Sequence, residues 1–101
     1  MDAPQETVDD LAARGPGHTL VDVRSPEDHA AGHVPGAINV PLDDVLADPT
    51  RTYGDGPVHV VCQSGRRSLK AATAMNDAGV AAVSVAGGTS AWIESGRPLE
   101  H

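Results

Sequence analysis

The chain has 101 residues, of which 40% are apolar and 21% are charged. That length suits one compact domain, and that composition is ordinary for a soluble globular protein and argues against a disordered chain. The 14 acidic and 7 basic residues give a net charge of −7, so the field of the whole molecule repels polyanions, and neither nucleic acid nor an anionic membrane surface is expected as a partner.

The first half of the chain alternates short apolar runs with segments that carry helix start and stop residues. A capping hydroxyl or a proline marks each helix start, and glycine or proline marks each stop. In chain order, the pattern predicts a helix from Thr7 to Gly15, a strand over 19–23, a helix over 25–32, a strand over 37–40, and one or two helical turns over 43–48.

The second half continues the alternation and contains the longest predicted helix. Residues 54–57, Gly-Asp-Gly-Pro, predict a turn, and the apolar run 58–61 after it predicts a buried strand. A helix is predicted over 67–78, a strand over 82–85 and a short helix over 88–95. The apolar stripe of the longest helix consists of Ala71, Ala72, Met75 and Ala78.

Strands that alternate with helices predict a parallel sheet with helices on both faces. We therefore expect one α/β domain over residues 1–101, with a small, mainly parallel sheet of about five strands. The ending 99–101, Leu-Glu-His, has the form of the start of an expression tag and carries no functional argument. No apolar run is long enough to span a membrane, residues 1–6 lack the features of a signal peptide, and a single cysteine forms no internal disulfide, so a cytoplasmic location is expected.

That one cysteine, Cys62, follows a predicted buried strand and precedes the longest predicted helix. Open α/β sheets bind ligands at this place. Gly65 allows the short loop to curl so that successive N–H groups point inward, and the helix N-terminus, Arg66 and Arg67 add positive charge. These influences favour thiolate and lower the pKa of Cys62 below the value of about 8.5 for a free cysteine. The loop therefore predicts a nucleophile that is ionised at neutral pH.

Three motifs along the chain resemble those of the rhodanese family, in the same order. The segment 61–68, Val-Cys-Gln-Ser-Gly-Arg-Arg-Ser, is similar to the family's active-site loop: a catalytic Cys, two variable residues, Gly, another residue, Arg, and Ser or Thr. Residues 22–41, which begin Asp-Val-Arg and include Gly-His-Val-Pro-Gly, resemble its N-terminal pattern, and residues 87–98 resemble its C-terminal pattern. His29 stands where the family usually has Tyr or Phe.

The resemblance implies a rhodanese-like fold and a sulfurtransferase that works in two steps. Cys62 would take a sulfur from an anionic donor such as thiosulfate, and a thiol or thioredoxin-like acceptor would remove it, with no metal or organic cofactor. The resemblance implies a substrate-binding loop made of Gln63, Ser64, Gly65, Arg66, Arg67 and Ser68. Arg66 is the candidate that attracts the donor, and Arg67 and Ser68 are expected to brace the loop.

Other polar and aromatic residues receive structural roles. Asp22 and Arg24 are expected to tie neighbouring segments together near the floor of the site, with Glu27 as an ion-pair partner of Arg24. The histidine spacings fit no zinc signature, so no metal site is expected. His33 is assigned to the structure of its turn, and Trp92 to packing.

Two alternatives to a sulfurtransferase function remain open. A Cys-based phosphatase or arsenate reductase uses Cys, five intervening residues and Arg, but Ser68 stands where that arginine belongs, and Arg67 comes one residue early. There is also no second cysteine to resolve an oxidised Cys62. The non-enzymatic alternative is a rhodanese-like binding module or sulfur carrier. Retention of Cys62, Gly65 and both arginines argues against an inactive domain and leaves a dedicated carrier open.

Overall fold

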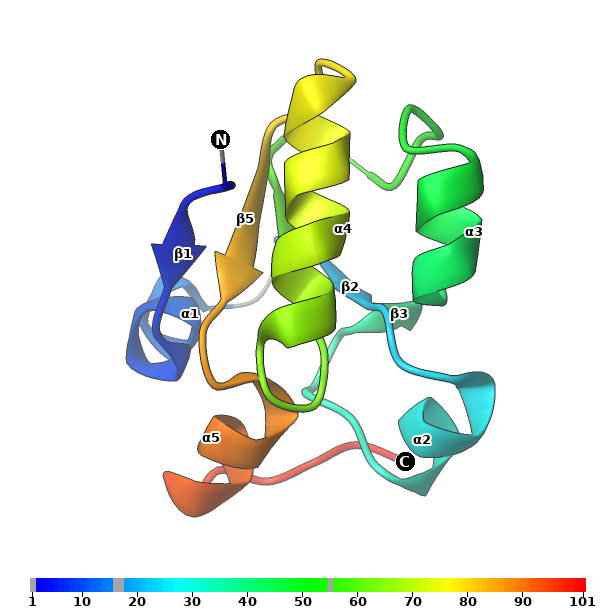
Figure 1. The fold of residues 1–101 in the computed structure, drawn as a ribbon. Helices are drawn as coiled ribbons and strands as arrows, with labels where there is room; N and C mark the ends of the chain where they lie inside the picture. Colours follow the sequence, from blue (N-terminus) through cyan, green and yellow to red (C-terminus); the bar gives the residue numbers. More distant parts are fainter. Residues whose placement is uncertain (1, 16–17, 55) are drawn as a thin grey trace.

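A computed structural model describes residues 2–15, 18–54 and 56–101, and in these residues five parallel strands form one sheet (Figure 1). The strand order is β1-β5-β4-β2-β3, which places the apolar strand β4 in the centre, buried at every position. The strands are β1 (Gln5–Glu6), β2 (Thr19–Asp22), β3 (Ile38–Asn39), β4 (Val58–Val61) and β5 (Ala82–Val85). The α/β class and the parallel sheet are confirmed.

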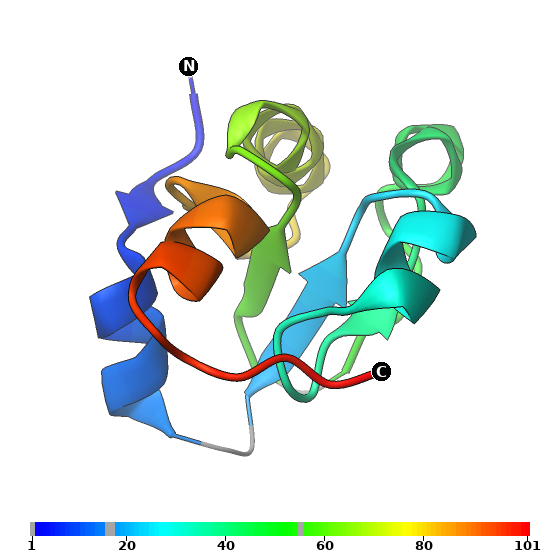
Figure 2. The same ribbon diagram turned by 90° about the horizontal axis from the view of Figure 1, so that it is seen from below.

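The described residues form five helices, and helices cover both faces of the sheet (Figure 2). They are α1 (Val8–Arg14), α2 (Pro26–Ala31), α3 (Leu42–Ala47), α4 (Arg66–Asp77) and α5 (Gly88–Glu94). Helices α3 and α4 pack on one face through a cluster that includes Val21, Val60 and Met75. Helices α1 and α5 cover the opposite face, where Val61 and Trp92 belong to a second cluster. Because successive side chains of a strand point to opposite faces of the sheet, Val60 and Val61 pack in different clusters.

The predicted N-caps of α1 and α2 are confirmed in atomic detail. Thr7 and Asp10 form a reciprocal capping box, in which Thr7 Oγ1 accepts from the Asp10 amide at 3.1 Å and Asp10 Oδ2 accepts from the Thr7 amide at 3.2 Å. Ser25 caps α2 by accepting from the Asp28 amide at 3.2 Å. One member of the predicted apolar stripe is wrong: Ala78 is the C-cap of α4 and lies exposed.

One strand of the sheet was not predicted. Strand β1 has no sequence signal, because Gln and Glu are weak strand formers. It forms because the carbonyl oxygens of Pro4 and Glu6 accept from the amides of Ser84 and Ala86 at 2.9 and 2.7 Å. In the predicted turn at 54–57, Asp55 lies outside the described residues.

The last residues contact the domain. Leu99 packs against the cluster beneath α1 and α5, and the Glu100 backbone exchanges two hydrogen bonds with the His33 backbone, at 2.8 and 2.9 Å. Among the helices that the structure describes, none combines the length and apolar character that crossing a membrane requires.

Candidate active site

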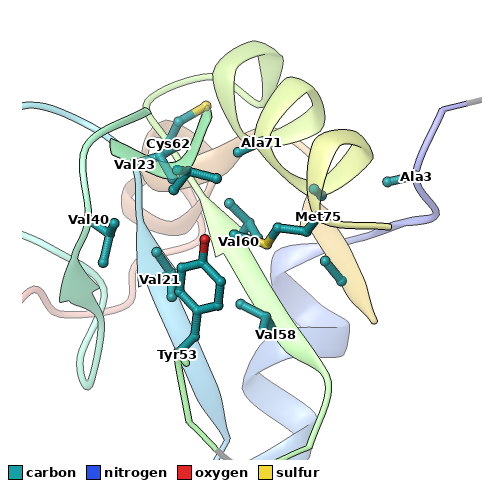
Figure 3. Packing of buried hydrophobic residues seen from close by; sticks show 13 residues of the cluster. Ala3, Val21, Val23, Val40, Tyr53, Val58, Val60, Cys62, Ala71 and Met75 are labelled. Carbon is teal, nitrogen blue, oxygen red and sulfur yellow. The ribbon is translucent and has the colours of Figure 1, made fainter. Parts of the chain in front are cut away.

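Cys62 lies at the carboxyl end of the central strand β4, where the chain turns into α4. Its side chain is buried, with 1% of its surface exposed, and its sulfur lies at the edge of the core nearest the start of α4 (Figure 3). The turn needs Gly65, which has a φ of +105°. A Cβ at Gly65 would also come within 3.1 Å of the Gly87 amide nitrogen, so the loop and the start of α5 are in close contact.

Hydrogen-bonding groups surround the Cys62 sulfur. The Gly65 amide donates to Sγ at 3.1 Å, and the thiol lies 3.4 Å from Ser68 Oγ, to which it donates. Ser68 Oγ donates to the Gly65 carbonyl at 3.1 Å and lies 2.8 Å from the hydroxyl of Ser84, a fully buried residue of β5. Ser84 therefore supports the hydroxyl that faces the sulfur. Sequence reasoning missed Ser84, although a serine between two valines in a buried strand is an unusual signal.

The surroundings of Cys62 have opposing effects on its ionisation. Burial raises the pKa of the thiol, but hydrogen bonds from the Ser68 hydroxyl and from the backbone amides of Ser68, Gly65 and Ser64 outweigh burial and lower the pKa below its ordinary value. These amides form the anion nest that the loop sequence predicted. The site can therefore stabilise negative charge on sulfur.

Removing the hydroxyl of Ser68 is expected to raise the pKa of Cys62, because this hydroxyl lies 3.4 Å from the sulfur and favours the thiolate by hydrogen bonding to it. The rate of thiol alkylation measured against pH should reach its midpoint below about 8.5 in the wild type and at a higher pH in Ser68→Ala. Ser64→Ala is the matched control, since its side chain is exposed and it keeps its backbone amide. Equal midpoints in the wild type and Ser68→Ala would contradict this role of the hydroxyl.

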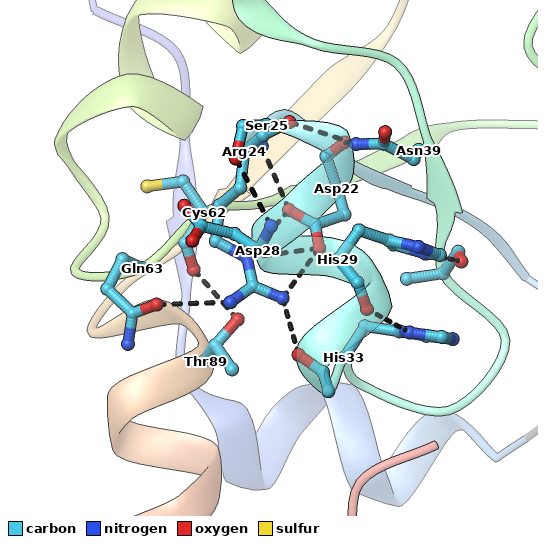
Figure 4. Close-up of polar contacts among 12 residues, drawn as sticks. Asp22, Arg24, Ser25, Asp28, His29, His33, Asn39, Cys62, Gln63 and Thr89 are labelled. Carbon is cyan, nitrogen blue, oxygen red and sulfur yellow. Dashed lines mark hydrogen bonds and ion pairs between the residues drawn. The ribbon is translucent and has the colours of Figure 1, made fainter. Parts of the chain in front are cut away.

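Arg24 and Asp22 form a buried ion pair next to the loop (Figure 4). Nε and Nη2 of Arg24 donate to the Asp22 carboxylate at 2.9 to 3.1 Å. Nη1 of Arg24 donates to Gln63 Oε1 at 3.1 Å, and Nη2 also donates to the Gly32 carbonyl at 2.7 Å. The pair thus ties three segments together, as expected. The expected pair of Arg24 with Glu27 is wrong, because Glu27 lies exposed and Asp22 takes the guanidinium.

The start of α5 holds the loop from the other side. The Thr89 amide and hydroxyl donate to the Cys62 carbonyl at 2.8 and 3.0 Å, and the Ser90 amide donates to the Gln63 carbonyl at 3.0 Å. The Gln63 side chain donates to Ser90 Oγ at 2.8 Å. These contacts pass next to Gly88, where a side chain would not fit. The Gly-Gly-Thr-Ser segment therefore fixes the backbone of the cysteine loop.

The two loop arginines differ from Ser68 in their surroundings. Arg66 and Arg67 are exposed, and within residues 2–15, 18–54 and 56–101 their side chains make no hydrogen bond or ion pair. The structure therefore gives Arg67 no bracing contact. Ser68 supplies the bracing contacts through its bonds to Gly65 and Ser84.

His29, His33 and Trp92 make contacts that stabilise the fold. His29 Nε2 donates to the Ala37 carbonyl at 2.8 Å, His33 Nδ1 donates to the His29 carbonyl at 2.8 Å, and the two rings stack at 3.7 Å. Trp92 is buried and its indole donates to the Pro98 carbonyl at 2.8 Å, which confirms its packing role. In the part of the chain that the structure describes, no group of three or more His, Cys, Asp or Glu side chains could hold a metal ion.

The chain is similar to known proteins in sequence and in fold. The family model of the rhodanese-like domain matches residues 4–95. The chain is 40% identical over 97 residues to thiosulfate sulfurtransferase 16, chloroplastic, of Arabidopsis thaliana, a match that covers 83% of this chain and 81% of the relative. A rhodanese-related protein from Thermoplasma volcanium superposes with a TM-score of 0.87 at 29% identity, over 96% of this chain and 97% of the other. The human single-domain sulfurtransferase TSTD1 superposes with a TM-score of 0.75 at 28% identity, over 91% and 96%.

Proposed function

Since the chain belongs to the rhodanese-like domain family, we propose that it moves a sulfane sulfur from a donor such as thiosulfate to a thiol or thioredoxin-like acceptor, through a persulfide on Cys62. The observation that carries this proposal is the set of hydrogen-bonding groups around the sulfur, above all the Gly65 amide, which donates to it at 3.1 Å. The Ser68 hydroxyl accepts from the thiol at 3.4 Å and can rotate to donate once the thiol has lost its proton. Such donors stabilise a thiolate before the reaction and a charged terminal sulfur after it. We expect a cytoplasmic location, because the cytoplasm keeps thiols such as Cys62 reduced.

In the first step, the Cys62 thiolate attacks the outer sulfur of thiosulfate. The sulfur–sulfur bond of the donor breaks, and sulfite leaves with the electron pair of that bond. Cys62 then carries one additional sulfur, whose negative charge the backbone amides of the Cys62 loop would stabilise. Arg66 is exposed beside the loop and attracts the anionic donor to it.

In the second step, a nucleophilic acceptor attacks the terminal sulfur. The bond between the two sulfur atoms breaks and Cys62 leaves as a thiolate, so the acceptor becomes a persulfide or, with cyanide, thiocyanate. Each step displaces one group with its electron pair, so the cycle needs no external oxidant, metal or organic cofactor. Arg24 takes no part in the bond changes and acts by positioning Gln63 in the loop.

Incubation with thiosulfate, followed by measurement of intact mass, tests this function. The wild type should gain the mass of one sulfur atom and lose it when cyanide is added, whereas Cys62→Ser should gain nothing. Failure to gain sulfur together with hydrolysis of an aryl phosphate would replace the proposal with the phosphatase alternative. Stable loading that neither cyanide nor simple thiols remove would instead identify a dedicated sulfur carrier.

A further inference from the structure

Most cations outside the cysteine loop have an acidic partner. Three of the 7 Lys and Arg residues form ion pairs: Arg14 with Glu6 at 3.5 Å, Arg24 with Asp22 at 2.9 Å, and Arg97 with Asp9 at 3.0 Å. In the described residues the other four cations are exposed and have no ion pair: Arg51, Arg66, Arg67 and Lys70. Three of these four lie within the first two turns of α4, directly after the Cys62 loop.

This charge placement opposes the stability of α4. The first turns of α1, α2 and α3 each carry two acidic residues, which interact favourably with the positive end of the helix dipole. The first turn of α4 carries no acidic residue and begins with Arg66 and Arg67. Cations at a helix N-terminus are unfavourable, so folding stability does not account for this placement. A role in attracting anions does account for it.

The positive charge extends beyond the reach of one small anion. Lys70 stands one helical turn after Arg66 on the same side of α4, because residues four apart are neighbours on a helix surface. Together with Leu69 and Thr73 these two residues line a shallow hollow, with Asp2 also at its wall. Leu69 is half-buried, so the hollow combines an apolar side chain with two cations. That combination fits a peptide segment with carboxylates and apolar side chains better than a lone dianion.

We propose that the cationic end of α4, defined as Arg66, Arg67 and Lys70, docks an acidic segment of the protein that carries the acceptor thiol. This inference rests on the proposed function. The net charge of −7 disfavours a long polyanion such as nucleic acid, whereas a short acidic segment meets only the local positive field. Docking brings the acceptor thiolate to the terminal sulfur of Cys62, where it takes that sulfur and releases the Cys62 thiolate.

Binding of labelled model peptides tests the docking without requiring catalysis. The probes are three fluorescein-labelled peptides with a serine in place of the reactive cysteine, flanked by four Glu, four Gln or four Lys residues, and the readout is fluorescence anisotropy. At low salt the wild type should bind the Glu peptide about tenfold more tightly than the Gln peptide, at the low end of electrostatic effects on association. The preference should shrink as salt is added.

Lys70→Glu should abolish this preference for the Glu peptide. Arg51→Glu is the matched control, because it makes the same charge change at an exposed position. Arg51 comes before the amino end of β4, whereas the Cys62 loop follows the carboxyl end of that strand. An equal loss in both variants would show that net charge alone is responsible and would overturn the proposal. Tighter binding of a single-stranded oligonucleotide of equal charge, or no preference in the wild type, would overturn it as well.

Sulfur transfer to the cysteine forms of the same peptides gives the second readout. Protein loaded with thiosulfate and freed of excess donor should transfer sulfur about tenfold faster to the Glu peptide than to the Gln peptide, after correction for the thiolate fraction of each peptide. Lys70→Glu should remove this difference and leave the reaction with cyanide within about twofold of wild type. Failure to load sulfur contradicts the proposed function, whereas normal loading with equal peptide rates contradicts only the docking.

Discussion

Gly88→Ala is expected to reduce sulfur transfer by about 100-fold or more, since a displacement of about 1 Å at a reacting group is enough for such a loss. Gly88 has a φ of +57°, and a Cβ there would overlap the Cys62 carbonyl oxygen and lie 2.8 Å from that of Gln63. These carbonyls accept hydrogen bonds from Thr89 and Ser90, so they cannot move away without losing those bonds. The loop and its sulfur must therefore shift. Steady-state transfer from thiosulfate to cyanide measures the loss.

Gly96→Ala separates this close contact from backbone strain. Gly96 has a φ of +83°, but nothing lies within 4 Å of a Cβ placed there. This variant should lose about 1–2 kcal/mol of unfolding free energy from its left-handed backbone and keep its activity. Gly88→Ala should lose a further 1–3 kcal/mol or so, because buried polar groups are left without partners. If Gly88→Ala and Gly96→Ala had the same activity, the contact of α5 with the loop would not matter for the reaction.

Arg24→Met is expected to lower the free energy of unfolding by about 3–5 kcal/mol, because it leaves the Asp22 carboxylate buried without its cation. Asp22 is fully buried and the Arg24 side chain is only 5% exposed, so water cannot replace the lost partner. Domains of this kind have a total stability of about 5–15 kcal/mol, and the loss would bring the protein close to unfolding. Urea unfolding at constant temperature measures the difference.

A double variant shows whether the stranded charge is the cause. Asp22→Asn combined with Arg24→Met removes both charges, and it should be more stable than Arg24→Met alone because no buried carboxylate is left unpaired. Strict additivity of the two substitutions would mean that the residues stabilise the fold independently of their pairing. The double variant should still transfer sulfur less well than wild type, because Gln63 has lost its contact with Arg24.

Local signals in the sequence were sufficient to predict the elements that position Cys62. The apolar run of β4 and the helix pattern after Gly65 predicted the strand–loop–helix unit, and the boundaries of β4 and β5 agree with the prediction. The family resemblance covered the motifs before and after it and is confirmed by the match over residues 4–95. These features depend on neighbours in sequence, on which propensity and patterning act directly.

Features that depend on distant segments were not predictable. Strand β1 exists because β5 offers it hydrogen bonds, and the hydroxyl of Ser84 reaches Ser68 because β5 lies beside β4. Glu27 was wrongly predicted to pair with Arg24, because both neighbouring carboxylates are close to Arg24 in sequence but the fold leaves Glu27 exposed and buries Asp22. Spacing alone gives no information on these directions.

The edges of the sheet have a consequence for the behaviour of the protein at high concentration. Both edge strands, β1 and β3, are two residues long, so each offers few backbone groups to a strand of another molecule. Pro4 immediately precedes β1, and Pro41 follows two residues after β3, where a missing N–H blocks further pairing. Ile38 on β3 is 48% exposed, yet it stands in a strand too short to recruit a neighbouring chain. The protein should therefore resist edge-to-edge aggregation, and lengthening β3 by Pro41→Val should promote it.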